Sequence, residues 1–232
     1  QPIFFTQDDF ERQRRHAQAL NMRGLFYLRR GEFQKAGQKF LNAQALQEKI
    51  GDGAGKAETL NNRGLLHYLV GQYDRAESLL TASLVLMRAQ RDREGEAVAL
   101  NQLGLVQYRQ GLIARMRRDD AVAETRDVAA LGLFRQAQEI VRALPDHRME
   151  GTLLNNIGLT SFELFALQRA RGDGESERHE IERAFGFYRK AGAAWERALR
   201  AYRDALQCAH ETGRRAAASA TLHNLGKLYA AA

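Results

Sequence analysis

Two short stretches decide the fold: Leu60-Asn61-Asn62-Arg63-Gly64 and, a few residues later, Gly71-Gln72-Tyr73-Asp74-Arg75-Ala76. The first stretch occurs five times in related form, and its glycine stands at Gly24, Gly64, Gly104, Gly158 and Gly226. These glycines are 40, 40, 54 and 68 residues apart. A period of this length predicts an array of stacked helical units, two regular and two enlarged.

The second stretch adds an aromatic residue followed by small and large apolar residues on one helical face. Its copies are Phe33, Ala36, Phe40 and Ala43; Tyr73, Ala76, Leu80 and Ser83; Ala130, Phe134 and Ala137; and Trp195, Ala198, Tyr202 and Ala205. Glycine and alanine allow two helices to approach closely. Gly31 and Gly71 are expected to end the first helix of a pair in the left-handed conformation, and Gly51 and Gly213 the second. Gly51-Asp52-Gly53-Ala54-Gly55-Lys56 is predicted to be a turn between repeats, because no strand precedes it as in a phosphate loop.

This pattern resembles the tetratricopeptide repeat (TPR) family, in its longer units of about 40 residues. The resemblance implies an all-α, right-handed superhelical solenoid of antiparallel helix pairs, with two elongated hairpins in the C-terminal half. We expect one domain over residues 1–232. Its units would cover about 12–51, 52–91, 92–145 and 146–213, and a terminal helix would cover 214–232.

The two enlarged units are expected to be extended hairpins, around Leu112 to Asp127 and around Phe165 to Gly192. In the last unit, Ile181, Phe185, Tyr188 and Trp195 form an aromatic and apolar stripe on a long helix that starts near Ser176. The stripe is interpreted as the core of the hairpin; the alternative is an arm that contacts a partner or a second copy of the chain. Arg115, Arg117 and Arg118 are expected at a solvated tip.

The composition predicts a folded, water-soluble helical protein. Hydrophobic residues make up 44% of the chain, prolines number two, and no apolar run is long enough to span a bilayer. The net charge of +7 favours acidic partners, but lysines and arginines alternate with acids along the helices, which argues against a nucleic-acid surface. We expect a cytoplasmic location; because the chain starts at Gln1 instead of Met, an exported form is the alternative.

An asparagine recurs three residues before the first four glycines, at Asn21, Asn61, Asn101 and Asn155, whereas the fifth copy has His223. In the TPR family this position faces the groove, and the series is similar to the asparagine ladder of kinesin light chain and related adaptors. The resemblance implies that these amides bind an extended peptide, with Leu65, Tyr68, Tyr108 and Arg109 beside them. The alternative is that the asparagines tie adjacent helices together. The positions one turn earlier hold Gln18, Glu58 and Val98, so the basic clamp for a C-terminal carboxylate is not expected.

No arrangement of residues in the sequence predicts catalysis, a metal site or a cofactor. The histidines lack ligand spacing, and Cys208 is the single cysteine. The predicted function is a protein interaction scaffold that binds an extended segment in its groove. The alternative, by resemblance to bacterial TPR regulators, is a sensory or regulatory module that responds to a peptide or a small effector.

Overall fold

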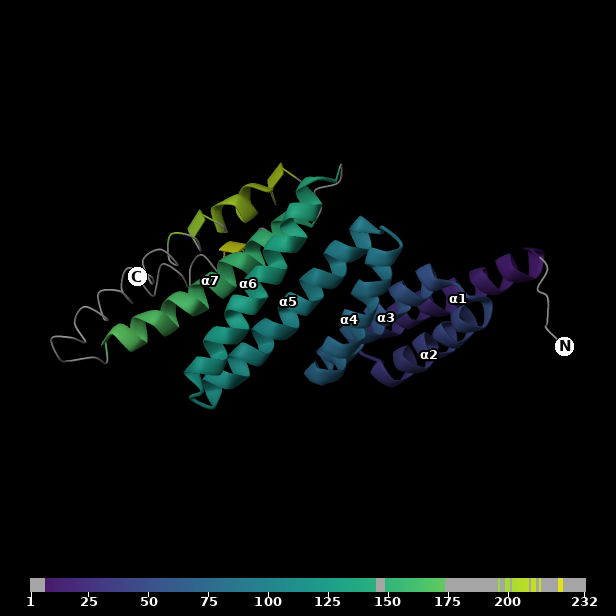
Figure 1. Cartoon of the computed structure of the whole chain (residues 1–232), viewed down its shortest axis with the longest axis horizontal. Helices are drawn as coiled ribbons and strands as arrows, with labels where there is room; N and C mark the ends of the chain where they lie inside the picture. The colour runs from purple at the N-terminus through teal and green to yellow at the C-terminus, as the bar shows by residue number, and fades with distance from the viewer. Residues whose placement is uncertain are drawn as a thin grey trace. The chain divides into compact units, whose positions relative to one another are not determined.

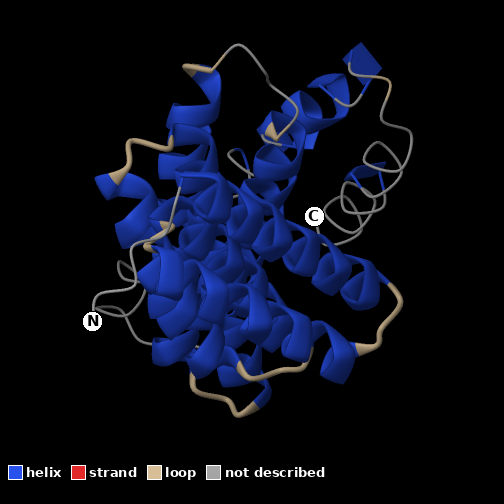
Figure 2. Ribbon diagram, turned by 90° about the vertical axis from the view of Figure 1, so that its right-hand side faces the viewer, coloured by secondary structure: helices blue, strands red, loops and turns tan. Residues whose placement is uncertain are grey.

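The computed structural model of the chain describes residues 7–144, 149–173, 196, 199–200, 202–208, 210–211, 213 and 221–222. In these residues every regular element is a helix and none is a strand (Figure 2). The predicted all-α class of consecutive helix pairs is therefore confirmed. No helix within these ranges combines the length and the apolar character needed to cross a lipid bilayer.

Seven helices follow one another along the described chain (Figure 1). They are α1 (Gln7–Arg29), α2 (Phe33–Ile50), α3 (Gly53–Leu69), α4 (Tyr73–Ala89), α5 (Arg93–Met116), α6 (Asp120–Arg142) and α7 (Glu150–Asp173). The chain divides within α5 into two compact units, Gln1–Val106 and Gln107–Ala232. The organisation of the whole chain as one solenoid domain stays a prediction.

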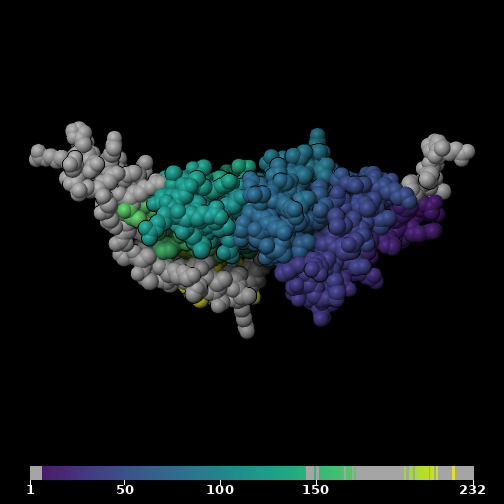
Figure 3. Space-filling model, turned by 90° about the horizontal axis from the view of Figure 1, so that it is seen from below, coloured from purple at the N-terminus to yellow at the C-terminus, as the bar shows by residue number. Residues whose placement is uncertain are grey.

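The first unit consists of two hairpins, α1 with α2 and α3 with α4, followed by the start of α5. Connections of only three residues join the helices of each pair, which makes the two helices antiparallel. Gly31 and Gly71 occupy these connections with φ of 74° and 77°, so their predicted left-handed conformation is confirmed. Figure 3 shows the atoms of this unit, from purple to blue, as one continuous packed body.

Close contact at the repeated glycine holds each hairpin together. A Cβ added to Gly24 would lie 2.6 Å from Cδ1 of Phe40, and one added to Gly64 would lie 2.6 Å from Cγ of Leu80. Phe40 and Leu80 are completely buried. Burial of such a side chain stabilises the fold by about 1.5–3 kcal/mol. The glycine and the large residue therefore pack as a pair, and this pair recurs with the 40-residue period.

The helices that begin a new repeat start with an aspartate that caps the helix. Asp52 accepts a hydrogen bond from the backbone N–H of Gly55 at 2.9 Å, and Asp92 accepts one from Gly95 at 2.9 Å. Such a cap stabilises a helix by about 0.5–2 kcal/mol. Gly51 precedes the first of these caps with φ of 70°. The turn between the helices consists of Gly51 and Asp52 alone, because Gly53–Lys56, predicted to belong to it, form the first turn of α3.

The second unit contains the end of α5 and all of α6, the helices of the repeat that the sequence predicts to be enlarged. They have 24 and 23 residues, against 17 or 18 for α2 to α4, and α1 also has 23. Arg115 is not at a solvated tip, because its guanidinium pairs with the buried Asp127 of α6 and lies 3.5 Å from Glu163 of α7. In a hairpin of this length, residues near the end of α5 still pack against two helices.

The last hairpin is described only in part. A Cβ on Gly158 of α7 would lie 2.7 Å from the ring of Tyr202, which is fully buried and packs against Leu159 and Phe162. The glycine contact thus recurs in the fourth repeat. Of the predicted long helix from Ser176, the structure describes residues 196, 199–200, 202–208 and 210–211, which are helical. Its stripe of Ile181, Phe185, Tyr188 and Trp195 lies outside the described residues, as do His223 and most of the predicted terminal helix 214–232.

Candidate functional site

The first helices of successive repeats enclose a cavity of about 500 Å³ in the first unit. Asn61 of α3 lines it, and we call it the Asn61 cavity. The other lining residues are Arg14, Gln18, Asp52, Ala54, Gly55, Glu58, Asn62, Met87, Asp92, Glu94, Gly95 and Val98. Gln18, Glu58 and Val98 stand one turn before the three asparagines, so the 40-residue period brings equivalent positions of α1, α3 and α5 to one place.

Asn21, the first asparagine of the series, ties α1 to α3. Its Nδ2 donates to Oε1 of Glu58 at 2.9 Å, and its Oδ1 accepts a hydrogen bond from Nδ2 of Asn62 at 3.1 Å. Only 2% of Asn21 is exposed. At this position, therefore, the amide connects adjacent repeats, as in the alternative interpretation of the series.

The surroundings of the Asn61 side chain differ from those of Asn21, although the two residues occupy the same position of successive repeats. Forty residues after Glu58 and Asn62, the partners of Asn21, the chain has Val98 and Gln102. Valine offers no acceptor, and the side-chain oxygens of Asn61 and Gln102 are both buried without a hydrogen-bond partner in the described part of the structure. A buried carbonyl oxygen without a donor is energetically costly, by about 1–3 kcal/mol. Asn61 thus has an unused acceptor next to the cavity.

The cavity is predominantly acidic. Four of its lining residues, Asp52, Glu58, Asp92 and Glu94, are acids, and Arg14 is the single cation among the lining residues. The pKa of Glu58 is raised by partial burial, against the hydrogen bond from Asn21, and further by the nearby carboxylates of Asp52 and Asp92. The Nε atom of Arg14 lies 4.0 Å from Oδ2 of Asp52, which is at the limit for an ion pair. The negative charge around Glu58 is therefore incompletely balanced, and a cation placed there would relieve it.

The remaining predicted site residues are not gathered around this cavity. Asn155 of α7 accepts a hydrogen bond from the hydroxyl of Thr221 at 3.4 Å, a contact within the second unit. Leu65 packs against the apolar cluster that contains Phe40, and Tyr68 forms an edge-to-face pair with Tyr73 at 5.9 Å between ring centres. Asn101 and Tyr108 are buried in α5, and Arg109 is exposed on it.

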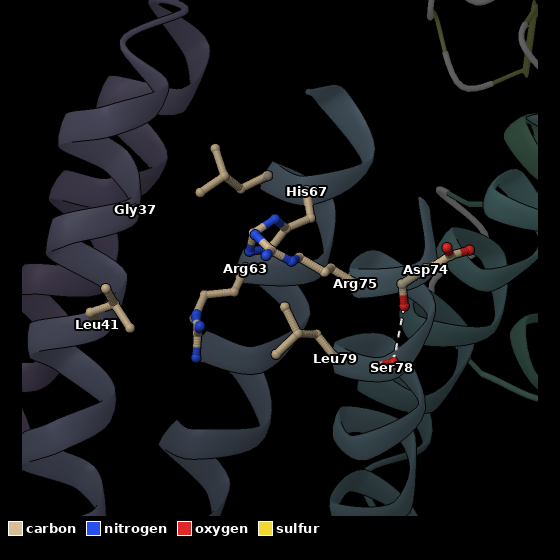
Figure 4. Close-up of a pocket in the computed structure, with 9 residues that line it drawn as sticks. Gly37, Leu41, Arg63, His67, Asp74, Arg75, Ser78 and Leu79 are labelled. Carbon is tan, nitrogen blue, oxygen red and sulfur yellow. Dashed lines mark hydrogen bonds between the residues drawn. The ribbon is translucent and has the colours of Figure 1, made fainter. Parts of the chain in front are cut away.

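A second cavity, of about 600 Å³, lies between α2, α3 and α4, and we call it the Arg63 groove. Figure 4 shows Arg63 and His67 of α3 and Arg75 of α4 directed into the space between Leu41 of α2 and Leu79 of α4. The complete lining is Gly37, Leu41, Arg63, Leu66, His67, Asp74, Arg75, Ser78 and Leu79. This surface combines leucines with basic groups.

Sequence reasoning missed both the acidic character of the first cavity and the existence of the second. A signal for the first was present, because Asp52 and Asp92 occur with the period of the repeat and each is followed three residues later by glycine. The second cavity has no repeated signature. It depends on which side chains of α2 and α4 flank α3.

Comparison with known sequences finds a family match in the first part of the chain. Two overlapping segments, residues 15–89 and 57–115, match the sequence model described as Tetratricopeptide repeat. No curated protein matches the chain.

Solved structures that align with the chain include BtubC (BKLC) from P. vanneervenii, at 19% identity and a TM-score of 0.48, over 82% of this chain. The alignment covers 64% of BtubC, less than two thirds of its length. A TPR repeats protein from Bacteroides fragilis aligns at 12% identity and a TM-score of 0.32, over 91% of this chain and 98% of that protein. Residues 15–115 therefore match tetratricopeptide repeats, and repeats of this family generally act as non-catalytic modules for protein interaction.

Proposed function

We propose that this protein is an interaction module that binds an extended segment of a partner protein in the Asn61 cavity. The observation that carries the proposal is the buried side-chain oxygen of Asn61, which has no donor among the described residues and lies at the cavity wall. The outer torsion of an asparagine side chain has broad minima. A modest rotation would turn this oxygen toward the backbone N–H of a bound segment.

The charge of the cavity indicates the side chains that such a segment would carry. Glu58 and Glu94 line the cavity, and no ion pair involves either of them among the described residues. A lysine or arginine of the partner would pair with them where the local dielectric constant is lower than in water. The expected ligand is therefore an extended segment with at least one basic residue.

Selection from a displayed library of unstructured peptides tests this function. Peptides of about twelve residues are selected on the intact chain, and the enriched ones are titrated by calorimetry. We expect enrichment in lysine and arginine. We also expect Asn61→Ala to weaken binding about tenfold, because one buried hydrogen bond to the peptide is lost.

Two further variants complete the design. Glu58→Gln should weaken binding and reduce its dependence on salt, since one charge is removed. Asn42→Ala, a matched change of an exposed asparagine on α2, should leave the affinity unchanged. Unchanged binding in both Asn61→Ala and Glu58→Gln, with helicity retained, would reject the Asn61 cavity as the binding site.

A further inference from the structure

The Arg63 groove lies on a different side of α3 from the Asn61 cavity. Arg63 follows Asn61 by two residues, which corresponds to a rotation of roughly 200° around a helix of 3.6 residues per turn. The two sites share no lining residue. One helix therefore contributes to two separate surfaces of the first unit.

The walls of the Arg63 groove are apolar. Leu66 is buried at its base, and Leu41 and Leu79 flank it from α2 and α4. Leu41 leaves 47% of its surface exposed, although it is a large apolar residue. Gly37 has no side chain at this wall, and an added Cβ would come within 3.3 Å of Leu66. The space is large enough for apolar side chains of another molecule.

Three basic groups line the same space, and their described hydrogen-bond partners are neutral. Arg63 donates to the side-chain oxygen of Gln44, and Arg75 donates to that of Gln72 at 3.3 Å. The Nδ1 atom of His67 lies 2.7 Å from the same Gln72 oxygen. A guanidinium has five N–H donors, so each arginine keeps donors that can bind an anion.

Arg63 is the group for which a missing anion matters most. It is half-buried, and burial lowers its pKa, an effect that the negative charge of Glu48 partly opposes. Charges that are withdrawn from water are usually paired with an opposite charge. Asp74 is the single acid among the nine lining residues, against Arg63, Arg75 and His67. The groove therefore has an excess of positive charge beside exposed leucine surface.

We propose that the Arg63 groove is a second interaction surface, which binds a segment of a partner protein that carries glutamate or aspartate next to leucine-like residues. Carboxylates of the segment pair with Arg63 and Arg75, and its apolar side chains pack against Leu41 and Leu79. A guanidinium binds a carboxylate through two parallel hydrogen bonds, which gives the contact direction as well as charge. This surface does not depend on the Asn61 cavity being a binding site.

Charge complementarity together with leucine walls favours a protein segment over a nucleic acid. A phosphate backbone would use the arginines but would leave the exposed face of Leu41 without a partner. A segment with both carboxylates and apolar side chains satisfies both features of the groove.

Fluorescence anisotropy with labelled peptides tests the proposal on the intact chain. The probe is an unstructured peptide in which glutamates alternate with leucines. The two comparison peptides replace every glutamate with glutamine or every leucine with serine. We expect measurable binding of the first peptide and at least about tenfold weaker binding of each comparison peptide, because each lacks one of the two required interactions.

Variants of the protein locate the binding. Arg63→Gln removes the charge and should weaken binding about tenfold, whereas Arg63→Lys should retain part of it. Arg23→Gln is the matched control, since Arg23 has the same register one repeat earlier, is exposed, and does not line the groove. Arg23→Gln and Asn61→Ala should each leave the affinity within about twofold of the original. If Arg63→Gln fails to fold, Arg75→Gln at the exposed edge of the groove takes its place.

Four results would overturn the proposal. The first is the absence of binding by the glutamate and leucine peptide at millimolar concentration. The second is equal binding by the glutamine peptide or by Arg63→Gln. The third is self-association of the chain that Arg63→Gln abolishes, which would show that a second copy occupies the groove. Loss of binding in Asn61→Ala with Arg63→Gln unaffected would place the acidic peptide in the Asn61 cavity and would also reject this surface.

Discussion

Substitution of Gly24 by alanine tests whether the repeated glycine is required by packing. A Cβ at this position would lie 2.6 Å from Cδ1 and 2.9 Å from Cζ of Phe40, far inside the contact distance of about 3.5–4.0 Å between carbon atoms. Phe40 is fully buried, so its ring has little room to move. Overpacking of this kind costs about 3 kcal/mol at the upper end of its usual range.

The higher helix propensity of alanine offsets part of this cost, by about 1 kcal/mol. The net expectation for Gly24→Ala is therefore a loss of about 2 kcal/mol of unfolding free energy. Gly132→Ala in α6 is the control, because an added Cβ there meets no atom within 4 Å. That variant should be more stable than the original by up to about 1 kcal/mol, since only the propensity changes.

Urea unfolding followed by far-UV circular dichroism measures both variants under the same conditions. Phe40→Ala removes the ring that the added Cβ would meet. In a double-mutant cycle, Gly24→Ala and Phe40→Ala should show a coupling free energy of about 1 kcal/mol, because the clash exists only while the ring is present. A Gly24→Ala variant as stable as the original would refute the packing argument.

The other predictions concern hydrogen bonds and charge. Asn21→Ala should cost about 2 kcal/mol of stability, because two buried hydrogen bonds are lost, whereas Asn61→Ala should cost less than about 1 kcal/mol; similar losses in urea unfolding would contradict the difference between the two amides. The pKa of Glu58 is raised in the folded state, so its ionisation opposes folding once the pH exceeds its ordinary value of 4.5, and the opposition is complete above the raised value. Glu58→Gln should therefore be the more stable protein at neutral pH, and its advantage should vanish as the pH falls below 4.5; a constant difference across a pH series of unfolding curves would be inconsistent with this cause. Tyr202→Phe removes a buried hydroxyl without a partner among the described residues, so stability should be unchanged or rise by up to about 1 kcal/mol, and a clear loss in thermal unfolding would mean that the hydroxyl has a partner.

The helix pairs could be predicted from sequence because their determinants are local and repeated. Gly31 and Gly71 mark the turns through their left-handed backbone, and Gly24 and Gly64 mark the contacts between helices. A feature that recurs with a constant period is recognisable even where each copy alone would be a weak signal.

The role of each asparagine could not be predicted from the repeated motif in the same way. Asn21 and Asn61 occupy the same position of successive repeats, yet only the first has the partners that tie it to the next helix. The difference arises forty residues further on, where Val98 replaces Glu58. The role of a repeated residue therefore depends on the neighbouring repeat, which a motif confined to one repeat does not include.

Net charge is a poor guide to what this protein binds, because the charges are separated across a single helix. The chain as a whole carries +7, which by itself suggests acidic partners. Within α3, however, Glu58 lines an acidic cavity, whereas Arg63 lines a basic groove. Since local charge decides which segment binds at short range, two partners of opposite charge fit the first unit better than one acidic partner does. Salt should weaken the binding of a basic segment in the Asn61 cavity and also the binding of an acidic segment in the Arg63 groove, because it screens both attractions. Titrations of the two segments at several salt concentrations, measured separately, would test this separation of charge.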